Sequence, residues 1–274
     1  MEENNYGRFV PIVHFEQIPI KNLVSNQEYQ RNLSQKHIQR TIKNFDVYQI
    51  NPVKVSRRDG LNYVVNGQHT IEIVAAVSGS RDTPVWCMVY DDIEYRHEAD
   101  IFANQQKYVR TLTAYEIFRA NIEAGNDEQL LIRDLVESFQ LKIGTSSGDC
   151  IICAVSALEE IYEKYGFHVL RRTLKLCVAS WEGDRHSLSG NILKGTAKLI
   201  VAYGDRILDD YFIEKLSNVS VKEINRSARE RDGGTNGYAE AILAVYNRKI
   251  KYPLDFAEIK RTVSNKVHSI GEGN

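Results

Sequence analysis

The spacing of apolar residues changes once along this 274-residue chain, near residues 107–115. Before that point strand-like and helix-like segments alternate, and from about residue 113 apolar side chains recur at helical spacing. Such a change predicts an α+β protein in two parts, a mixed α/β domain over residues 1–112 and an all-α domain over residues 113–274. Both parts are long enough to bury a core of their own.

The charge balance and the apolar runs restrict the classes of function. The chain has 35 basic and 36 acidic residues and a formal net charge of -1. Binding to nucleic acid would therefore depend on a local basic patch. No apolar run approaches the roughly 20 residues that cross a bilayer, and the first residues do not follow the pattern of a signal peptide. We expect a cytoplasmic protein that does not bind membranes.

Cysteine spacing gives no metal site. Cys150 and Cys153 form a C-x-x-C pair within a stretch of helical period, which places both thiols on one buried helix face. No second pair of Cys or His residues supplies the other half of a zinc site. We interpret the cysteines as structural and reduced.

Three segments of the first part have the composition of strands. Residues 9–20 are β-branched and bounded by prolines, which suits a sheet edge. Residues 83–92 are mostly apolar and are expected at the centre of the sheet. Residues 51–67 read as a hairpin, because Asp59-Gly60 separates two β-branched runs.

The hairpin leads into a strand–glycine–helix turn. The run from Tyr63 to Val65 stops at Asn66-Gly67, and a helical pattern that closes at Gly79 begins almost at once. A glycine turn at a helix N-terminus presents unpaired backbone N–H groups and the positive end of the helix dipole. This arrangement suits a phosphate group.

Four short motifs, which include this turn, occur in a fixed order. They are Tyr29-Gln30-Arg31, Asn51-Pro52-Val53-Lys54-Val55, Asn66-Gly67-Gln68-His69-Thr70 and Ala103-Asn104-Gln105-Gln106-Lys107. In this order they resemble the motifs of the ParB family, whose N-terminal domain has the fold shared with sulfiredoxin. The resemblance covers roughly residues 10–120. It implies a ParB/sulfiredoxin-like fold for the first domain.

The resemblance also implies a nucleotide site, because members of this fold bind CTP or ATP, with Mg²⁺, at the glycine turn. Carried over to this chain, the phosphate-binding residues are Arg31, Gly67, Gln68, His69, Thr70, Asn104, Gln106 and Lys107. Two turn arginines of the partition proteins are replaced here by His69 and Thr70, and Lys107 stands in place of an arginine. Loss of guanidinium groups predicts weaker triphosphate binding, because charge-assisted hydrogen bonds are the stronger class.

The same fold also includes enzymes, so catalysis remains open at this point. A phosphotransferase on this fold uses an acidic base, for which Glu72, Asp91 and Asp92 are the candidates. A nuclease would need carboxylates that bind a metal, and Asp91, Asp92 and Glu94 are the candidates. A third alternative is a fold that has lost its ligand and serves as an interaction module.

The helical part offers two candidate surfaces for DNA. The helix expected over residues 148–165 is apolar and acidic, which does not suit a recognition helix. Arg171, Arg172 and Lys175 on the next helix are better placed. Residues 219–266 hold ten basic and six acidic residues, a surplus that fits either phosphate contacts or ordinary solvated helix faces.

These observations predict a ParB-like protein that associates with DNA, of the chromosome-partition or regulatory type and carried by a phage or another mobile element. A homodimer is compatible with this prediction. The sequence does not select the nucleotide or the DNA sequence.

Overall fold

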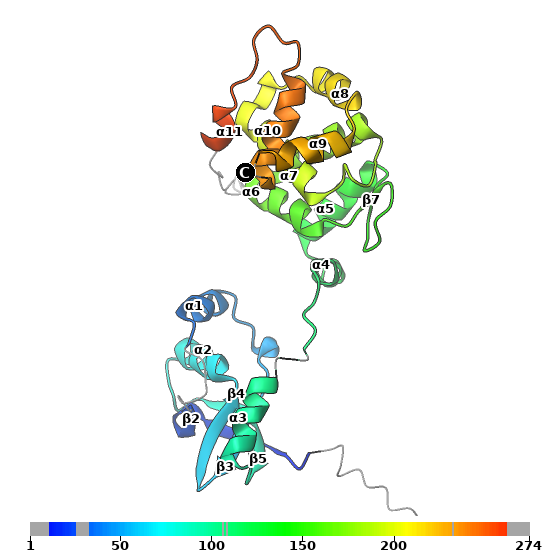
Figure 1. Ribbon diagram of the computed structural model, residues 1–274. Helices are drawn as coiled ribbons and strands as arrows, with labels where there is room; N and C mark the ends of the chain where they lie inside the picture. Colours follow the sequence, from blue (N-terminus) through cyan, green and yellow to red (C-terminus); the bar gives the residue numbers. More distant parts are fainter. Residues whose placement is uncertain (1–10, 26–32, 106, 108, 232, 262–274) are drawn as a thin grey trace, which may run out of the picture. The chain divides into compact units, whose positions relative to one another are not determined.

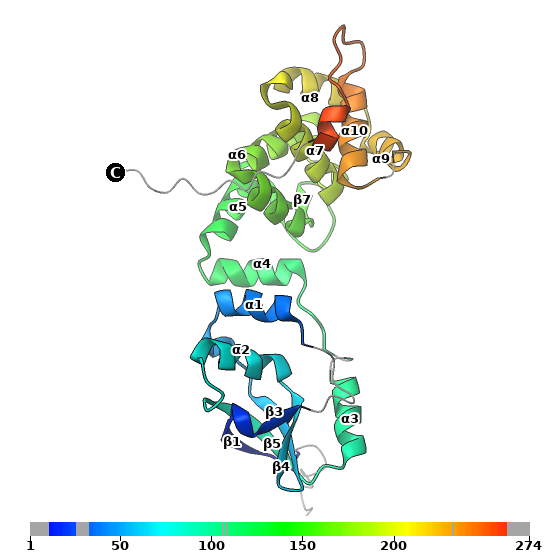
Figure 2. The same cartoon turned by 90° about the vertical axis from the view of Figure 1, so that its left-hand side faces the viewer.

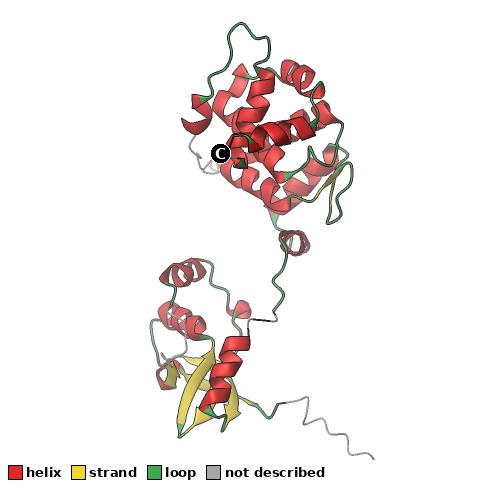
Figure 3. Cartoon of the chain, viewed as in Figure 1, coloured by secondary structure: helices red, strands yellow, loops and turns green. Residues whose placement is uncertain are grey.

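The computed structural model describes residues 11–25, 33–105, 107, 109–231 and 233–261. The chain divides into two compact units, residues 1–110 and 111–274. The first unit contains a five-stranded mixed sheet with helices, and the second is mostly helical (Figure 3). This confirms the predicted fold class, except that the second unit is not all-α, since it also holds one pair of short strands.

The strand order of the sheet is β1-β5-β3-β4-β2. The strands are β1 (His14–Pro19), β2 (Leu23–Ser25), β3 (Val53–Arg58), β4 (Leu61–Asn66) and β5 (Pro84–Asp91). β1 lies at the edge, antiparallel to β5, and β5 runs parallel to β3. The predicted edge and inner strands and the predicted hairpin of β3 and β4 are confirmed.

Alternating side chains of β5 build the core of the first unit. Val85, Cys87 and Val89 are buried, whereas the residues between them are more exposed, as expected when one sheet face packs on a core. The helices of this unit are α1 (Gln35–Lys43), α2 (Gln68–Ser78) and α3 (Tyr95–Asn104), with short 3₁₀ turns η2 (Ile20–Asn22) and η3 (Val47–Gln49). α2 adds Ile71 and Val74 to this core, and α1 lies beside α2 (Figure 2).

The second unit packs its helices around α7, which contacts both α6 and α10 (Figure 1). Its elements are α4 (Ala114–Glu123), α5 (Asp127–Ser138), β6 (Lys142–Ile143), β7 (Ile151–Ile152), α6 (Val155–Trp181), α7 (Gly190–Tyr203), η4 (Gly204–Arg206), α8 (Asp209–Ser217), α9 (Val221–Arg229), α10 (Gly234–Tyr246) and α11 (Ala257–Arg261). Within the described residues, no helix is both long enough and apolar enough to cross a membrane.

The placement of Cys150 and Cys153 on a buried helix face was wrong. Both residues precede α6 and are exposed. Ile151–Ile152 pairs as a strand with β6, and Cys150 has a φ of +60°. The backbone N–H of Cys150 donates to the carbonyl oxygen of Gly183 at 2.8 Å. Pairing with β6 and with Gly183 therefore overrides the local helical period at this point.

We expect only two of the four cysteines to react with an aromatic disulfide reagent in the folded protein. Burial raises the pKa of Cys87 to about 11 and that of Cys177 to about 12, so neither forms a reactive thiolate near neutral pH. Cys150 and Cys153 are exposed. Stopped-flow titration at mildly alkaline pH should show two fast thiols, and two more after denaturation. Fast reaction of a third thiol would contradict this burial.

Candidate functional site

The turn between β4 and α2 can be made only by a glycine without strain. Gly67 has a φ of +109°, a region that L side chains rarely adopt. A Cβ added there would lie 3.1 Å from both Cγ atoms of Val53 and 3.2 Å from its Cα. The register of β3 against β4 also shifts just before the turn, between Lys54 and Val55, which leaves Val65 as an extra residue. Gly67 thus brings the start of α2 close against β3.

The N-cap residue of α2 is Gly67, which has no side chain with which to cap the first turn. The first N–H groups of a helix have no partner within the helix and are satisfied by caps, water or ligands. Gln68, His69 and Thr70 supply these groups here. The arrangement suits an anion, since the N–H groups and the helix dipole both favour negative charge.

His69 joins the start of α2 to the start of α1. Its Nε2 accepts a hydrogen bond from the backbone N–H of Ser34 at 3.0 Å, and its ring meets the ring of His37 edge-on, with centroids 5.4 Å apart. Ser34 is the N-cap of α1, and its hydroxyl oxygen accepts from the backbone N–H of His37. His69 uses Nε2 as an acceptor, so in this arrangement that nitrogen cannot donate to a phosphate.

The opposite wall of the site comes from the C-terminal end of α3. Phe102, Ala103 and Gln105 lie there. The Oε1 atom of Gln105 is buried and has no hydrogen-bond partner among the described residues. A buried amide oxygen without a partner is uncommon in proteins and calls for a ligand or a water. Because an amide group can rotate, Gln105 could offer either its oxygen or its N–H₂ to a bound molecule.

A salt bridge holds α3 in this position. Nε of Arg58, on β3, donates to Oε1 of Glu98 at 2.8 Å, and Glu98 is 0% exposed. The guanidinium carbon of Arg58 also lies 3.9 Å from the ring centroid of Tyr63 and 5.6 Å from that of Tyr95. The hydrogen bond to Glu98 raises the pKa of Arg58. The pair therefore fixes the helix that carries Gln105 to the sheet.

Together these walls enclose a cavity of about 310 Å³. The described residues that line it are His37, Val65, Asn66, Gly67, Gln68, His69, Thr70, Phe102, Ala103 and Gln105. The lining is polar at the helix start and apolar at Val65 and Phe102. It includes no lysine, arginine or carboxylate among the described residues, so its attraction for anions comes from backbone N–H groups and the dipole of α2.

Four of the eight residues expected to bind phosphate line this cavity, namely Gly67, Gln68, His69 and Thr70. Asn104 does not, because its amide donates to the backbone and carboxylate oxygens of Asp100 at 3.0 and 2.8 Å. Lys107 is exposed and is not among the lining residues. Arg31 and Gln106 lie outside the described residues.

The acidic candidates for catalysis do not line the cavity. Both carboxylate oxygens of Glu72 accept from Arg81, at 3.1 and 3.0 Å. Oδ2 of Asp91 lies 3.2 Å from Nδ1 of His14 at the far end of β5. Asp92 follows in a left-handed turn with a φ of +57°. The described residues also contain no cluster of three or more His, Cys, Asp or Glu side chains that could hold a metal ion.

Two of the three expected DNA contacts are engaged within the helical unit. Arg172 donates to Oδ1 of Asp209 at 2.8 Å and to the carbonyl oxygens of Gly204 and Ile207. Lys175 donates to Oδ2 of Asp209 at 2.9 Å. Burial favours the neutral acid, but these hydrogen bonds outweigh it and lower the pKa of Asp209. Both cations therefore tie α6 to α8, whereas Arg171 forms no such ion pair with the residues that the structure describes.

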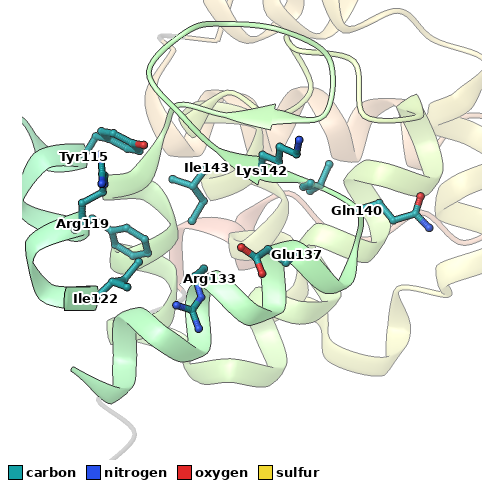
Figure 4. Close-up of a pocket in the computed structure, with 10 residues that line it drawn as sticks. Tyr115, Arg119, Ile122, Arg133, Glu137, Gln140, Lys142 and Ile143 are labelled. Carbon is teal, nitrogen blue, oxygen red and sulfur yellow. The ribbon is translucent and has the colours of Figure 1, made fainter. Parts of the chain in front are cut away.

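The helical unit has a cavity of its own, of about 610 Å³. Figure 4 shows Tyr115, Arg119 and Ile122 on one side, with Arg133 and Glu137 of α5 facing them. Lys142 and Ile143 of β6 close a third side. Arg133 is bound to Asp134 at 2.7 Å. None of the residues expected from the sequence to form a site lies there.

These features define an α+β protein with a glycine-turn cavity in its sheet unit. The chain belongs to a family of unknown function (DUF6551), which it matches over residues 24–255.

Among solved structures, the chain is similar to the C-terminally truncated chromosome-partitioning protein ParB from Caulobacter crescentus, crystallised in complex with CTP-γ-S. The identity is 12%, and the alignment covers 85% of this chain and 98% of that one, with a TM-score of 0.36. At this TM-score the two backbones superpose only loosely, so the likeness transfers neither a ligand nor an activity. No curated protein sequence matches the chain.

Proposed function

We propose that the first unit binds a nucleotide, CTP or ATP, with its phosphates at the start of α2, and that the protein associates with DNA in a ParB-like partition or regulatory role on a phage or mobile element. The observation that carries the nucleotide part is the cavity at Gly67, which joins the glycine-capped N-terminus of α2 to Oε1 of Gln105, a buried atom without a hydrogen-bond partner in the described part of the chain. The order of the four sequence motifs supports the DNA part.

The two walls of the cavity suit different parts of a nucleotide. The N–H groups of Gln68 to Thr70 would bind phosphate oxygens. The amide of Gln105 would form hydrogen bonds with the polar edge of the base or with a ribose hydroxyl. The ring of Phe102 would pack against the apolar surface of the base or the ribose. Because the described lining has no carboxylate, Mg²⁺ would be held by the phosphates and by water. Glu72, Asp91 and Asp92 do not line the cavity, so we propose binding without catalysis.

Isothermal titration of the full chain with CTP, ATP and GTP, each with Mg²⁺, tests the nucleotide part. We expect binding by at least one of them, and a weaker affinity for the Gln105→Met variant, which keeps the side-chain length but removes the polar amide. No heat from any of the three nucleotides would overturn the nucleotide part and leave the fold as an interaction module.

The Thr70→Arg variant is expected to bind nucleotide at least about tenfold more tightly. Thr70 lines the cavity at the helix start, and an arginine there can form charge-assisted hydrogen bonds to a phosphate, worth about 1.5–3 kcal/mol each. Val77→Arg is the matched control, because it adds the same charge to an exposed position near the other end of α2. Equal affinities for the two variants would contradict a phosphate at the start of α2.

A further inference from the structure

α8 and α9 form a pair of short helices joined by a tight turn. Each has nine residues, and the turn consists of Asn218, Val219 and Ser220. Val219 is buried and its carbonyl oxygen accepts from Nε1 of Trp181 at 2.9 Å, which fixes the turn to the core. Ser220 caps α9, since its hydroxyl oxygen accepts from the backbone N–H of Glu223. Two helices joined by a three- to four-residue turn are the framework of a helix-turn-helix motif.

α9 separates its residues onto two faces. Val221, Ile224 and Ala228 are buried, and α9 packs against α10. Lys222, Arg226 and Arg229 are exposed on the other face, four and seven residues apart, so they form one row along the helix. Asn225 lies beside this row. These four residues and Glu230 line a shallow hollow of about 490 Å³.

The three cations of this row do not stabilise the helical unit through ion pairs with described residues. Lys222, Arg226 and Arg229 form no ion pair with a described residue. The acid within α9, Glu223, is bound at 2.8 Å by Arg248, which follows the C-terminal end of α10, so its charge is compensated. Glu230 remains as an acid at the C-terminal end of the hollow. A row of one sign whose charges no described residue pairs favours an anionic partner that extends along the helix.

We propose that α9 is the DNA-contacting helix of this protein and enters the major groove of duplex DNA. The groove of B-form DNA admits an α-helix, and Arg, Lys and Asn are the residue types that bind guanine and adenine edges there. Lys222, Arg226 and Arg229 bind phosphates or guanine, and Asn225 binds adenine. This inference rests on the DNA part of the proposed function and places the contact away from Arg172 and Lys175, which the fold itself uses.

The test is fluorescence anisotropy of a labelled duplex of mixed sequence with the full chain, across about 50–200 mM salt. The variant is Lys222→Ala/Arg226→Ala/Arg229→Ala. Its matched control is Lys36→Ala/Arg40→Ala/Lys43→Ala, because these three exposed cations have the same spacing on α1. We expect the α9 variant to bind at least about tenfold more weakly, with the slope of log affinity against log salt reduced by about three. The α1 variant should bind like the wild type.

The other outcomes distinguish the proposal that the protein binds DNA from the assignment of the contact to α9. If the wild type binds DNA and the α9 variant binds equally well, or the α1 variant loses as much, the assignment to α9 is wrong and the DNA part of the proposed function stands. If the wild type binds no duplex at low salt, both fail, while the nucleotide titration still judges the first unit. Tighter binding to RNA or to polyglutamate than to duplex DNA would overturn the assignment in favour of those partners.

Base reading is tested by selecting duplexes from a random library with the wild type and with Asn225→Ala. We expect the variant to lose an adenine preference at one position and to keep its salt dependence, because Asn225 carries no charge. An unchanged selected sequence would show that α9 binds the backbone alone, which overturns its role in reading bases.

Discussion

The Gly67→Ala variant is expected to weaken nucleotide binding at least about tenfold and to destabilise the first unit by about 1–3 kcal/mol. The loss of binding corresponds to about one charge-assisted hydrogen bond. A φ of +109° is strained for alanine, and the new Cβ would press on Val53, which is fully buried and cannot move away without disturbing the sheet. The start of α2 must shift to relieve this contact, and its N–H groups shift with it. Calorimetric titration measures the affinity, and urea denaturation measures the stability.

Gly79→Ala separates the two effects. Gly79 ends α2 with a φ of +72°, but a Cβ there would meet nothing within 4 Å. The control therefore carries a positive-φ penalty without the contact at Val53, and it lies at the far end of the helix. We expect it to lose some stability and to keep wild-type affinity. Equal loss of affinity in both glycine variants would show that binding follows general stability rather than the geometry of the Gly67 turn.

The Glu98→Gln variant is expected to raise the equilibrium constant for local opening of α3 roughly a hundredfold. Removing one partner of a fully buried ion pair costs about 3–5 kcal/mol. The cost is lower here, about 2.8 kcal/mol for a hundredfold change, because Arg58 is partly exposed and also lies 3.6 Å from Asp59. Arg58 would be left stacked on Tyr63 with no carboxylate at its Nε. Hydrogen exchange by mass spectrometry on the full chain should show faster exchange in residues 95–104, while α6 and α7 provide an internal control.

The Glu98→Gln variant also tests whether nucleotide affinity depends on the stability of α3. α3 carries Gln105 and Phe102 on its C-terminal end, so loosening α3 should also weaken nucleotide binding. Arg58→Leu/Glu98→Leu replaces both charges with apolar groups and should recover much of the protection, because no unpaired charge remains. Exchange in residues 95–104 that matches the wild type for Glu98→Gln would show that the ion pair does not hold α3.

Local signals in the sequence predicted the turns well. Asp59 and Gly60 both adopt positive φ, of 51° and 73°, as a two-residue hairpin turn requires, so the hairpin could be predicted from two letters. Gly67 and Gly79 mark the two ends of α2, because both positions require a positive φ. Such positions depend only on the conformational freedom of one or two residues.

Long-range pairing explains what the sequence did not reveal. β2 is only three residues long and was not predicted, since it is formed by pairing with β4. Gln105 lies within one of the four motifs, but the resemblance assigns phosphate binding to its neighbours Asn104 and Gln106. The burial of Gln105 beside Gly67 depends on the packing of α3 against the sheet, which the local sequence does not specify. In the sequence, Glu223 lies among the cations of α9 and would balance them, as on an ordinary solvated helix face. Its pairing with Arg248, 25 positions away, cannot be read from the sequence.

The central claim, a nucleotide phosphate at the start of α2, is tested most directly by backbone amide NMR of the isotope-labelled full chain during titration with CTP or ATP and Mg²⁺. We expect progressive shifts of the amides of Gly67, Gln68, His69, Thr70 and Gln105, with no comparable shifts in residues 111–261. Shifts that gather instead around Arg119 and Lys142, which line the cavity of the helical unit, or the absence of any shift, would contradict the account.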